Sequence, residues 1–164
     1  MDKYTISLPV IDRNLSNKGI LGVCTDSPDD LRNGLETLAR YFKREFHYDG
    51  IQYEANEHHF EHVEYKGFVF VEPALDALTE EHSETPSRLL GGCCFRHRQY
   101  SDGLHWILDW IWLHPYARRR GILKKHWKFF REIFGDDFHV TPPISPAMEA
   151  FLAKQRHGRQ IKQA

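Results

Sequence analysis

The chain has 164 residues and a mass of 19.4 kDa, which fits one domain with a single hydrophobic core. Hydrophobic residues make up 41% of the sequence and aromatic residues 13%, so we expect a folded globule and not a disordered chain. A net charge of −1 and a pI near 6.8 argue against broad nucleic-acid binding, because proteins of that class usually carry a basic excess.

The N-terminus, the apolar stretches and the cysteines predict a cytoplasmic protein. Residues 1–8 lack a positive region followed by an apolar run, so we expect no signal peptide. The most apolar stretch, residues 104–113, is too short to span a bilayer, and we expect no membrane partner. Three cysteines do not suggest a disulfide framework, and Cys93 and Cys94 should point to opposite faces of a strand as reduced thiols.

The first third of the chain predicts two short strands and a helix. Residues 4–8 and 20–24 are the strand candidates. Ser27 as cap and Pro28 in the first turn indicate the start of a helix, which Asp49-Gly50 should end. Its apolar face recurs at three- and four-residue spacing, at Leu31, Leu35, Leu38, Phe42 and Phe46. Residues 51–65 fit a helix or a polar loop.

The rest of the chain predicts an antiparallel meander followed by helix, strand and helix. The meander strands are residues 67–72, 89–96 and 105–113, with a short helix plus loop over 74–86. A helix over about 119–134 and a strand over 138–140 follow. Ser145 as cap and Pro146 at the first position begin the last helix, and residues 155–164 should fray. No repeat or linker divides the chain, so residues 1–164 are expected to form one domain.

The most informative stretch joins the third meander strand to the next helix. Three arginines, Arg118 to Arg120, precede Gly121 where that helix should begin. Positive charge opposes the dipole at a helix N-terminus, at a cost of about 0.3–1 kcal/mol per charge, unless an anion is bound there. Exposed amides at a helix start also attract anions, and a glycine allows a phosphate to approach the backbone closely. The segment is therefore predicted to bind phosphate.

Residues 113–123, Leu-His-Pro-Tyr-Ala-Arg-Arg-Arg-Gly-Ile-Leu, resemble the acyl-CoA-binding signature of the GNAT superfamily of N-acetyltransferases. Arg118 falls on the Arg/Gln position of that signature and Gly121 on its first glycine. Leu123 departs from it, because the family prefers Gly or Ala there. The order helix, three strands, helix, strand, helix is also the order of the GNAT fold.

The resemblance implies an α/β (α+β) fold with a mixed, largely antiparallel central sheet flanked by helices. A splayed strand pair, residues 106–113 and 138–140, would form the acyl-CoA slot. The implied activity is transfer of an acetyl group from acetyl-CoA to a primary amine by direct attack in a ternary complex. The amine belongs to a small molecule or a protein, and a homodimer stays open. The cofactor-binding residues implied are Ile111, Leu113, Arg118, Arg119, Arg120, Gly121, Ile122, Leu123 and Lys124.

Asp109 is the first candidate for the base that accepts the amine proton. It interrupts an apolar, aromatic strand, where burial would raise its pKa. It also stands four residues before Leu113, where the family often places an acid. Glu72, at the end of the neighbouring strand, is the second candidate, and His105 is the third.

The general acid is less clear from the resemblance. Many family members use a tyrosine on the last helix, and Leu152 falls at that position here. Ser145 or a water would then protonate the thiolate, or it would leave unassisted. The alternative function is a binding module of the same fold that holds CoA or a partner protein without catalysis, which Leu123 and the missing tyrosine favour.

Two other patterns were weighed against simpler explanations. His58 and His62 have i, i+4 spacing with Glu54 nearby, but a solvent-facing histidine cluster is favoured, and we expect no metal. Trp106, Trp110 and Trp112 share one parity on their strand, which predicts one aromatic face and an opposite, aliphatic face that carries Asp109.

Overall fold

A six-stranded sheet forms the centre of the molecule. The computed structural model describes residues 7–55, 65–136, 138–142 and 144–155. The sheet order is β2-β3-β4-β5-β6, and β1 pairs with β4 at its side. Every pairing is antiparallel except the one between β5 and β6. The strands are β1 (Val10–Ile11), β2 (Ile20–Val23), β3 (Tyr65–Pro73), β4 (Ser87–Tyr100), β5 (Gly103–Leu113) and β6 (His139–Val140).

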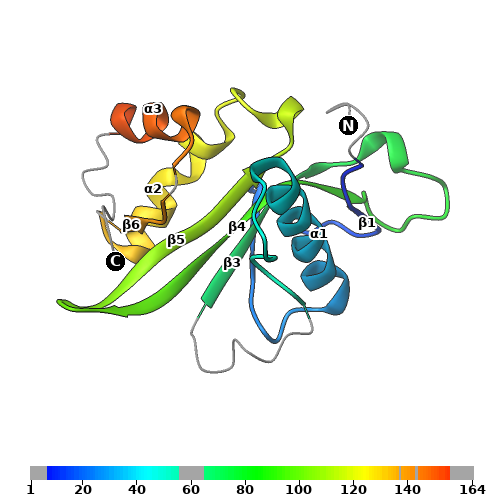
Figure 1. Ribbon diagram of the computed structural model, residues 1–164. Helices are drawn as coiled ribbons and strands as arrows, with labels where there is room; N and C mark the ends of the chain where they lie inside the picture. Colours follow the sequence, from blue (N-terminus) through cyan, green and yellow to red (C-terminus); the bar gives the residue numbers. More distant parts are fainter. Residues whose placement is uncertain (1–6, 56–64, 137, 143, 156–164) are drawn as a thin grey trace.

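Helices cover both faces of this sheet (Figure 1). The long helix α1 (Asp29–Phe46) packs on one face, and α2 (Ile122–Phe134) packs on the other. Helix α3 (Pro146–Lys154) lies against α2, where the ring of Phe151 meets that of Trp127 at 5.0 Å. Two short 3₁₀ turns, η3 (Leu75–Ala77) and η4 (Pro115–Ala117), follow β3 and β5. The predicted mixed, largely antiparallel sheet flanked by helices is confirmed.

The core has two halves, one on each side of the sheet. Leu31, Leu35, Leu38 and Phe42 of α1 are buried, as their spacing predicted. Gly92 lets α1 approach β4 closely, because a Cβ there would come within 2.7 Å of the Leu35 side chain. The other half is largely aromatic and is formed by Phe68, Phe70, Phe95, Trp127, Phe130, Phe134 and Phe138.

The adjacent cysteines divide between these two halves. Cys93 belongs to the α2 side and Cys94 to the α1 side, as predicted for neighbours on a strand. Burial raises the pKa of both thiols, that of Cys94 to about 12. The nearby charge of Arg96 lowers the pKa of Cys94 by a smaller amount. Both side chains are fully buried and contribute to the packing of the two halves.

Several predicted boundaries moved. Ser7 and Leu8 form no strand, and residues 1–6 lie outside the described part, so the first strand is β1. Helix α1 ends at Phe46 and not at Asp49-Gly50, because His47 takes a left-handed φ of 59° as its C-cap. Ser27 does not cap α1; its hydroxyl accepts a hydrogen bond from the Cys24 amide at 2.9 Å.

Other expectations were met in part. The meander and the capping of α3 by Ser145 are confirmed. Phe46, predicted on the apolar face of α1, is 40% exposed. Residues 56–64 and 156–164, which include His58, His62 and the expected frayed tail, lie outside the described residues. Within the described part, no helix is long and apolar enough to cross a membrane.

Candidate functional site

Strands β5 and β6 run parallel for only two residue pairs, because β6 ends at Val140. Ile107 pairs with His139 and Leu108 with Val140, and the Thr141 amide donates to the Leu108 carbonyl at 3.0 Å. Strand β5 continues to Leu113 while still paired with β4 on its other side. Among the described residues, the edge of β5 beyond Leu108 therefore has no strand partner on the β6 side.

Asp109 is the first residue of β5 after its pairing with β6 ends. The register between β4 and β5 shifts there, because Cys94 pairs with Trp110 and Phe95 with Leu108, which leaves Asp109 as the extra residue of a β-bulge. Bulges often redirect a side chain next to a functional site. The Asp109 carboxylate points to the α1 side of the sheet, because its partner Arg96 also contacts the Gln52 carbonyl and the ring of Tyr65, which packs against the α1-side core.

Both oxygens of Asp109 are engaged by arginines of β4. Arg96 Nε donates to Oδ2 at 2.9 Å and Arg98 donates to Oδ1 at 3.2 Å. The side chains of Asp109 and Arg96 are 7% and 3% exposed, whereas that of Arg98 is 48% exposed. Arg96 also donates to the Gln52 carbonyl at 2.9 Å. The carboxylate is therefore an ion-paired group and not the isolated acid that its apolar strand suggested.

The bulge also corrects the predicted faces of β5. Trp110 and Trp112 lie on the α1 side, but Trp106 packs on the α2 side, where its ring meets that of Phe134 at 5.0 Å. The prediction of one face shared by all three tryptophans, with Asp109 opposite, was wrong. The extra residue inverts the alternation within the strand, which strict period-two counting cannot anticipate.

The segment after β5 is anchored to α1 by Arg118. Its guanidinium donates two hydrogen bonds to the Glu45 carboxylate, at 3.0 and 2.7 Å, and a third to the Leu113 carbonyl at 2.9 Å. Trp112 Nε1 donates to the same carboxylate at 3.0 Å. The Arg118 side chain, for which a cofactor contact stays a prediction, fixes the position of the loop relative to α1 and β5.

The loop then presents backbone amides at the start of α2. Arg119 and Gly121 take left-handed φ values of 64° and 77°, whereas Arg120 between them does not. Such alternation forms concave clusters of amides that bind anions. Gly121 is the N-cap, no side chain caps the helix, and a Cβ at Gly121 would meet no atom within 4 Å. The helix begins at Ile122, three residues later than predicted, because left-handed residues cannot continue a right-handed helix.

The remaining cofactor candidates divide between exposed cations and core side chains. Arg119, Arg120 and Lys124 are exposed around the start of α2. The side chains of Ile111, Leu113, Ile122 and Leu123 are partly buried and pack against the α2-side core.

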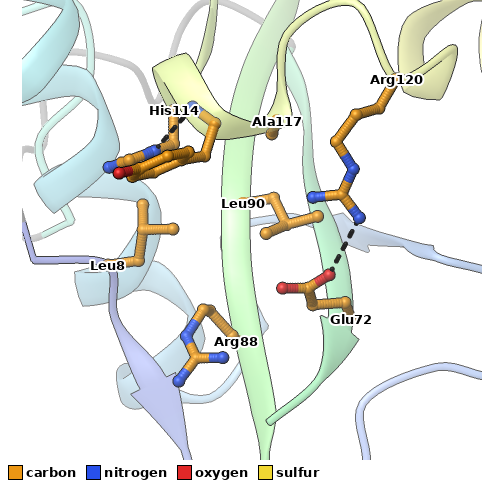
Figure 2. A pocket seen from close by; sticks show the side chains of 8 residues that line it. Leu8, Glu72, Arg88, Leu90, His114, Ala117 and Arg120 are labelled. Atoms are coloured by element: carbon orange, nitrogen blue, oxygen red, sulfur yellow. Dashed lines mark hydrogen bonds and ion pairs between the residues drawn. The ribbon is translucent and has the colours of Figure 1, made fainter. Parts of the chain in front are cut away.

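Glu72 lies near the end of β3, on the wall of a cavity beneath the η4 loop (Figure 2). Arg120 donates to its carboxylate at 3.3 Å, in a pair whose side chains are 50% and 32% exposed. This cavity has a volume of about 280 Å³. Glu72 thus lies two strands away from Asp109, in the sheet order β3-β4-β5.

The other catalytic candidates occupy separate places. His105 lies near the hairpin end of β5, with Nε2 at 2.8 Å from Asp102, and its ring stacks on His139 at 4.8 Å. Ser145 is the N-cap of α3, and its hydroxyl accepts from the Met148 amide at 3.1 Å. Leu152 is 1% exposed within the α2-side core. The described residues contain no group of three or more His, Cys, Asp or Glu side chains placed to hold a metal ion.

Sequence analysis missed the roles of Glu45 and Arg96. Glu45 lies 73 residues from Arg118, and no local pattern connects the two. The role of Arg96 could have been predicted from its position at the end of an apolar strand, because a buried cation requires a partner. Asp109 was the acid on the adjacent strand.

The chain was compared with known proteins. No family model and no curated protein matches it. It is similar to crystal structures of an aminoglycoside acetyltransferase, meta-AAC0020, from an uncultured soil metagenomic sample, one in complex with sisomicin and one with trehalose. Each has a TM-score of 0.45 and 14% identity over 88% of this chain and 89% of that chain. A probable acetyltransferase gives a TM-score of 0.45 and 18% identity over 88% and 91%. These likenesses are weak, and no function is inferred from them.

Proposed function

We propose that the protein is an acyl-CoA-dependent N-acetyltransferase, in which a primary amine attacks acetyl-CoA directly in a ternary complex. One observation carries the proposal. Among the described residues, the edge of β5 beyond Leu108 pairs with no other strand on the β6 side. This edge leads, through the loop that Arg118 anchors, to the uncapped amides at the start of α2. A strand edge offers hydrogen bonds to an extended amide chain, and a helix N-terminus binds phosphate.

The residues present fit acyl-CoA at both ends of this arrangement. The amides of the first turn of α2 would hold the pyrophosphate, with Arg119, Arg120 and Lys124 supplying positive charge. The open space at Gly121 leaves room for a phosphate against the backbone. The edge of β5 from Asp109 to Leu113 would hydrogen-bond the amide-containing arm of the cofactor. Proximity and polarisation of the thioester carbonyl by a backbone amide would supply the catalysis.

Asp109 is the proposed proton acceptor. The amine nitrogen attacks the thioester carbonyl, its proton passes to Asp109, and the carbon–sulfur bond breaks to release CoA as a thiolate. Oδ1 is the oxygen that an amine would reach, because its partner Arg98 is half exposed and more distant, while Oδ2 is held by the buried Arg96. The bulge at Asp109 supports this assignment over Glu72.

A thiol-release assay tests the activity. Acetyl-CoA is incubated with the protein and a panel of primary amines that includes polyamines, aminoglycosides, free lysine and peptide N-termini. We expect amine-dependent release of free thiol. Mass spectrometry should also detect an acetylated amine about 42 Da heavier than the free amine, since an acetyl group replaces one hydrogen. Binding of acetyl-CoA without release for any amine would favour the alternative, a binding module that holds CoA without catalysis.

A further inference from the structure

The cavity beneath the η4 loop adjoins the proposed acyl-CoA site and shares Arg120 with it. Its walls come from the ends of β3 and β4, from Leu8 and from residues 114–120 (Figure 2). No residue of β5, β6, α2 or α3 lines the described cavity, so it lies on the β3–β4 side of the loop and not along the β5 edge. With a volume of about 280 Å³, it is of a size for a small molecule.

The charges around this cavity are of both signs. Glu72 and Arg120 meet at 3.3 Å through a single contact, and both side chains are partly exposed. Pairs of this kind contribute little to stability and are easily opened. Arg88 is held more firmly, because it donates to both oxygens of Asp76 at 2.8 and 2.7 Å. A ligand that separates Glu72 from Arg120 would need to supply a new partner to each of them.

This requirement selects the class of ligand. A simple anion would satisfy Arg120 but would lie against the Glu72 carboxylate, and a simple cation would lie against two arginines. A molecule with an ammonium and a carboxylate a short distance apart satisfies both groups, since a carboxylate pairs well with the planar guanidinium.

Three of the remaining lining residues are apolar, and His114 and Tyr116 complete the wall on the loop side. Leu90 and Ala117 are 5% and 1% exposed, and Leu8 lies across the cavity from Glu72 and Arg120. We propose that this cavity binds a small zwitterionic amine of the aliphatic amino-acid type, with its ammonium on Glu72, its carboxylate on Arg120 and its side chain against Leu8, Leu90 and Ala117. The inference does not rest on the proposed acetyl transfer.

Three probes of matched shape test the proposal. L-leucine carries both charges, 4-methylpentanoate lacks the ammonium, and isopentylamine lacks the carboxylate. Each is titrated into the ¹⁵N-labelled full chain without CoA, and the backbone amides of Ala117 and Arg120 are followed by NMR. We expect L-leucine to shift these amides and to bind about tenfold more tightly than either fragment, because each charged pair is lost in one of them.

Glu72→Gln is the matched variant, because it keeps the shape and removes the charge. It should lower L-leucine affinity to about that of 4-methylpentanoate, a change of about tenfold. Glu132→Gln, an exposed glutamate on α2, is the charge control and should leave the affinity unchanged. No amide shift with millimolar L-leucine, or equal L-leucine affinity in wild type and Glu72→Gln, would overturn the proposal. Neither outcome depends on whether acetyl-CoA binds.

Discussion

The two faces of the sheet are packed by different chemistry. On the α2 side, the core is largely aromatic. Its central residue Phe95 contacts the rings of Phe68, Phe130, Phe134 and Phe138. On the α1 side, apolar packing is interrupted by two ion-pair networks, one at Asp109 and one at Glu45.

The positions of these networks explain the difference. The Asp109 network lies where the pairing between β5 and β6 ends. The Glu45 network anchors the loop before α2 through Trp112 and Arg118. Buried ion pairs add little net stability compared with apolar packing of the same volume. We infer that the α2 side chiefly stabilises the fold, while the α1 side orients the groups of the proposed site.

The largest expected effect comes from the α1 side. Asp109→Asn keeps the shape of the side chain and removes the proposed base, so turnover should fall by about 10²–10⁴-fold, more than with Glu72→Gln. Acetyl-CoA affinity, measured by calorimetry, should change little.

Asp109→Asn also leaves the buried Arg96 with a neutral partner, so its assay belongs at a temperature where thermal melts show both proteins folded. Asp102→Asn removes an exposed carboxylate near the other end of β5 and is the matched control. A greater loss of turnover with Glu72→Gln would assign the base to β3 instead.

The α2 side should respond in stability. Phe95 is fully buried and stacks on Phe134 at 4.0 Å, so Phe95→Ala should lower the free energy of unfolding by about 3–5 kcal/mol. Urea denaturation measures this change. A loss below about 1 kcal/mol would contradict the assignment of this side to stability.

Glu45→Gln should separate positioning from stability. The amide still accepts from Trp112 Nε1 but loses the charge that holds Arg118. Because both side chains are partly exposed, we expect a stability loss of only about 1 kcal/mol. The looser loop should weaken acetyl-CoA binding severalfold. Unchanged affinity in calorimetry would show that the Glu45–Arg118 pair does not orient the loop.

A smaller effect concerns pH and the α2 side. Burial, and then the charge of Lys125, lowers the pKa of His126 below its usual 6.5. The unfolded chain therefore binds a proton more readily, so this contribution to stability is present above about pH 6.5 and is lost as the pH falls toward the folded-state pKa. Thermal melts at pH 7.5 and 5.0 should show a smaller decrease for His126→Gln than for the wild type. An equal decrease would contradict this prediction.

Much of the fold followed from periodicity and capping. The apolar spacing of α1, the meander and the Ser145 cap are local features that the sequence displays directly. The bulge at Asp109 was not predictable in this way, because one extra residue depends on how β4 and β5 pair and inverts the faces of the tryptophans. The later start of α2 was not predictable either. It follows from the left-handed backbone of Arg119, a conformation that arginine seldom takes.

The site was predicted less completely than the fold. Anion binding by residues 118–121 stays a prediction from three cations at a helix start, whereas the anchoring of the loop by Arg118 through Glu45 was not predicted. Such long-range pairs require the tertiary structure, because nothing local relates the end of α1 to the loop after β5. The same holds for Glu72, whose partner Arg120 lies 48 residues away.

Calorimetric titration of acetyl-CoA tests the central claim most directly. The wild type should bind, and Arg119→Glu combined with Arg120→Glu should weaken binding by at least about tenfold, because charge-assisted contacts to phosphate are lost. Lys128→Glu combined with Lys154→Glu makes the same change in net charge at exposed lysines elsewhere and should bind as the wild type does. Equal affinity in the folded arginine double variant, or no binding by the wild type, would contradict the account.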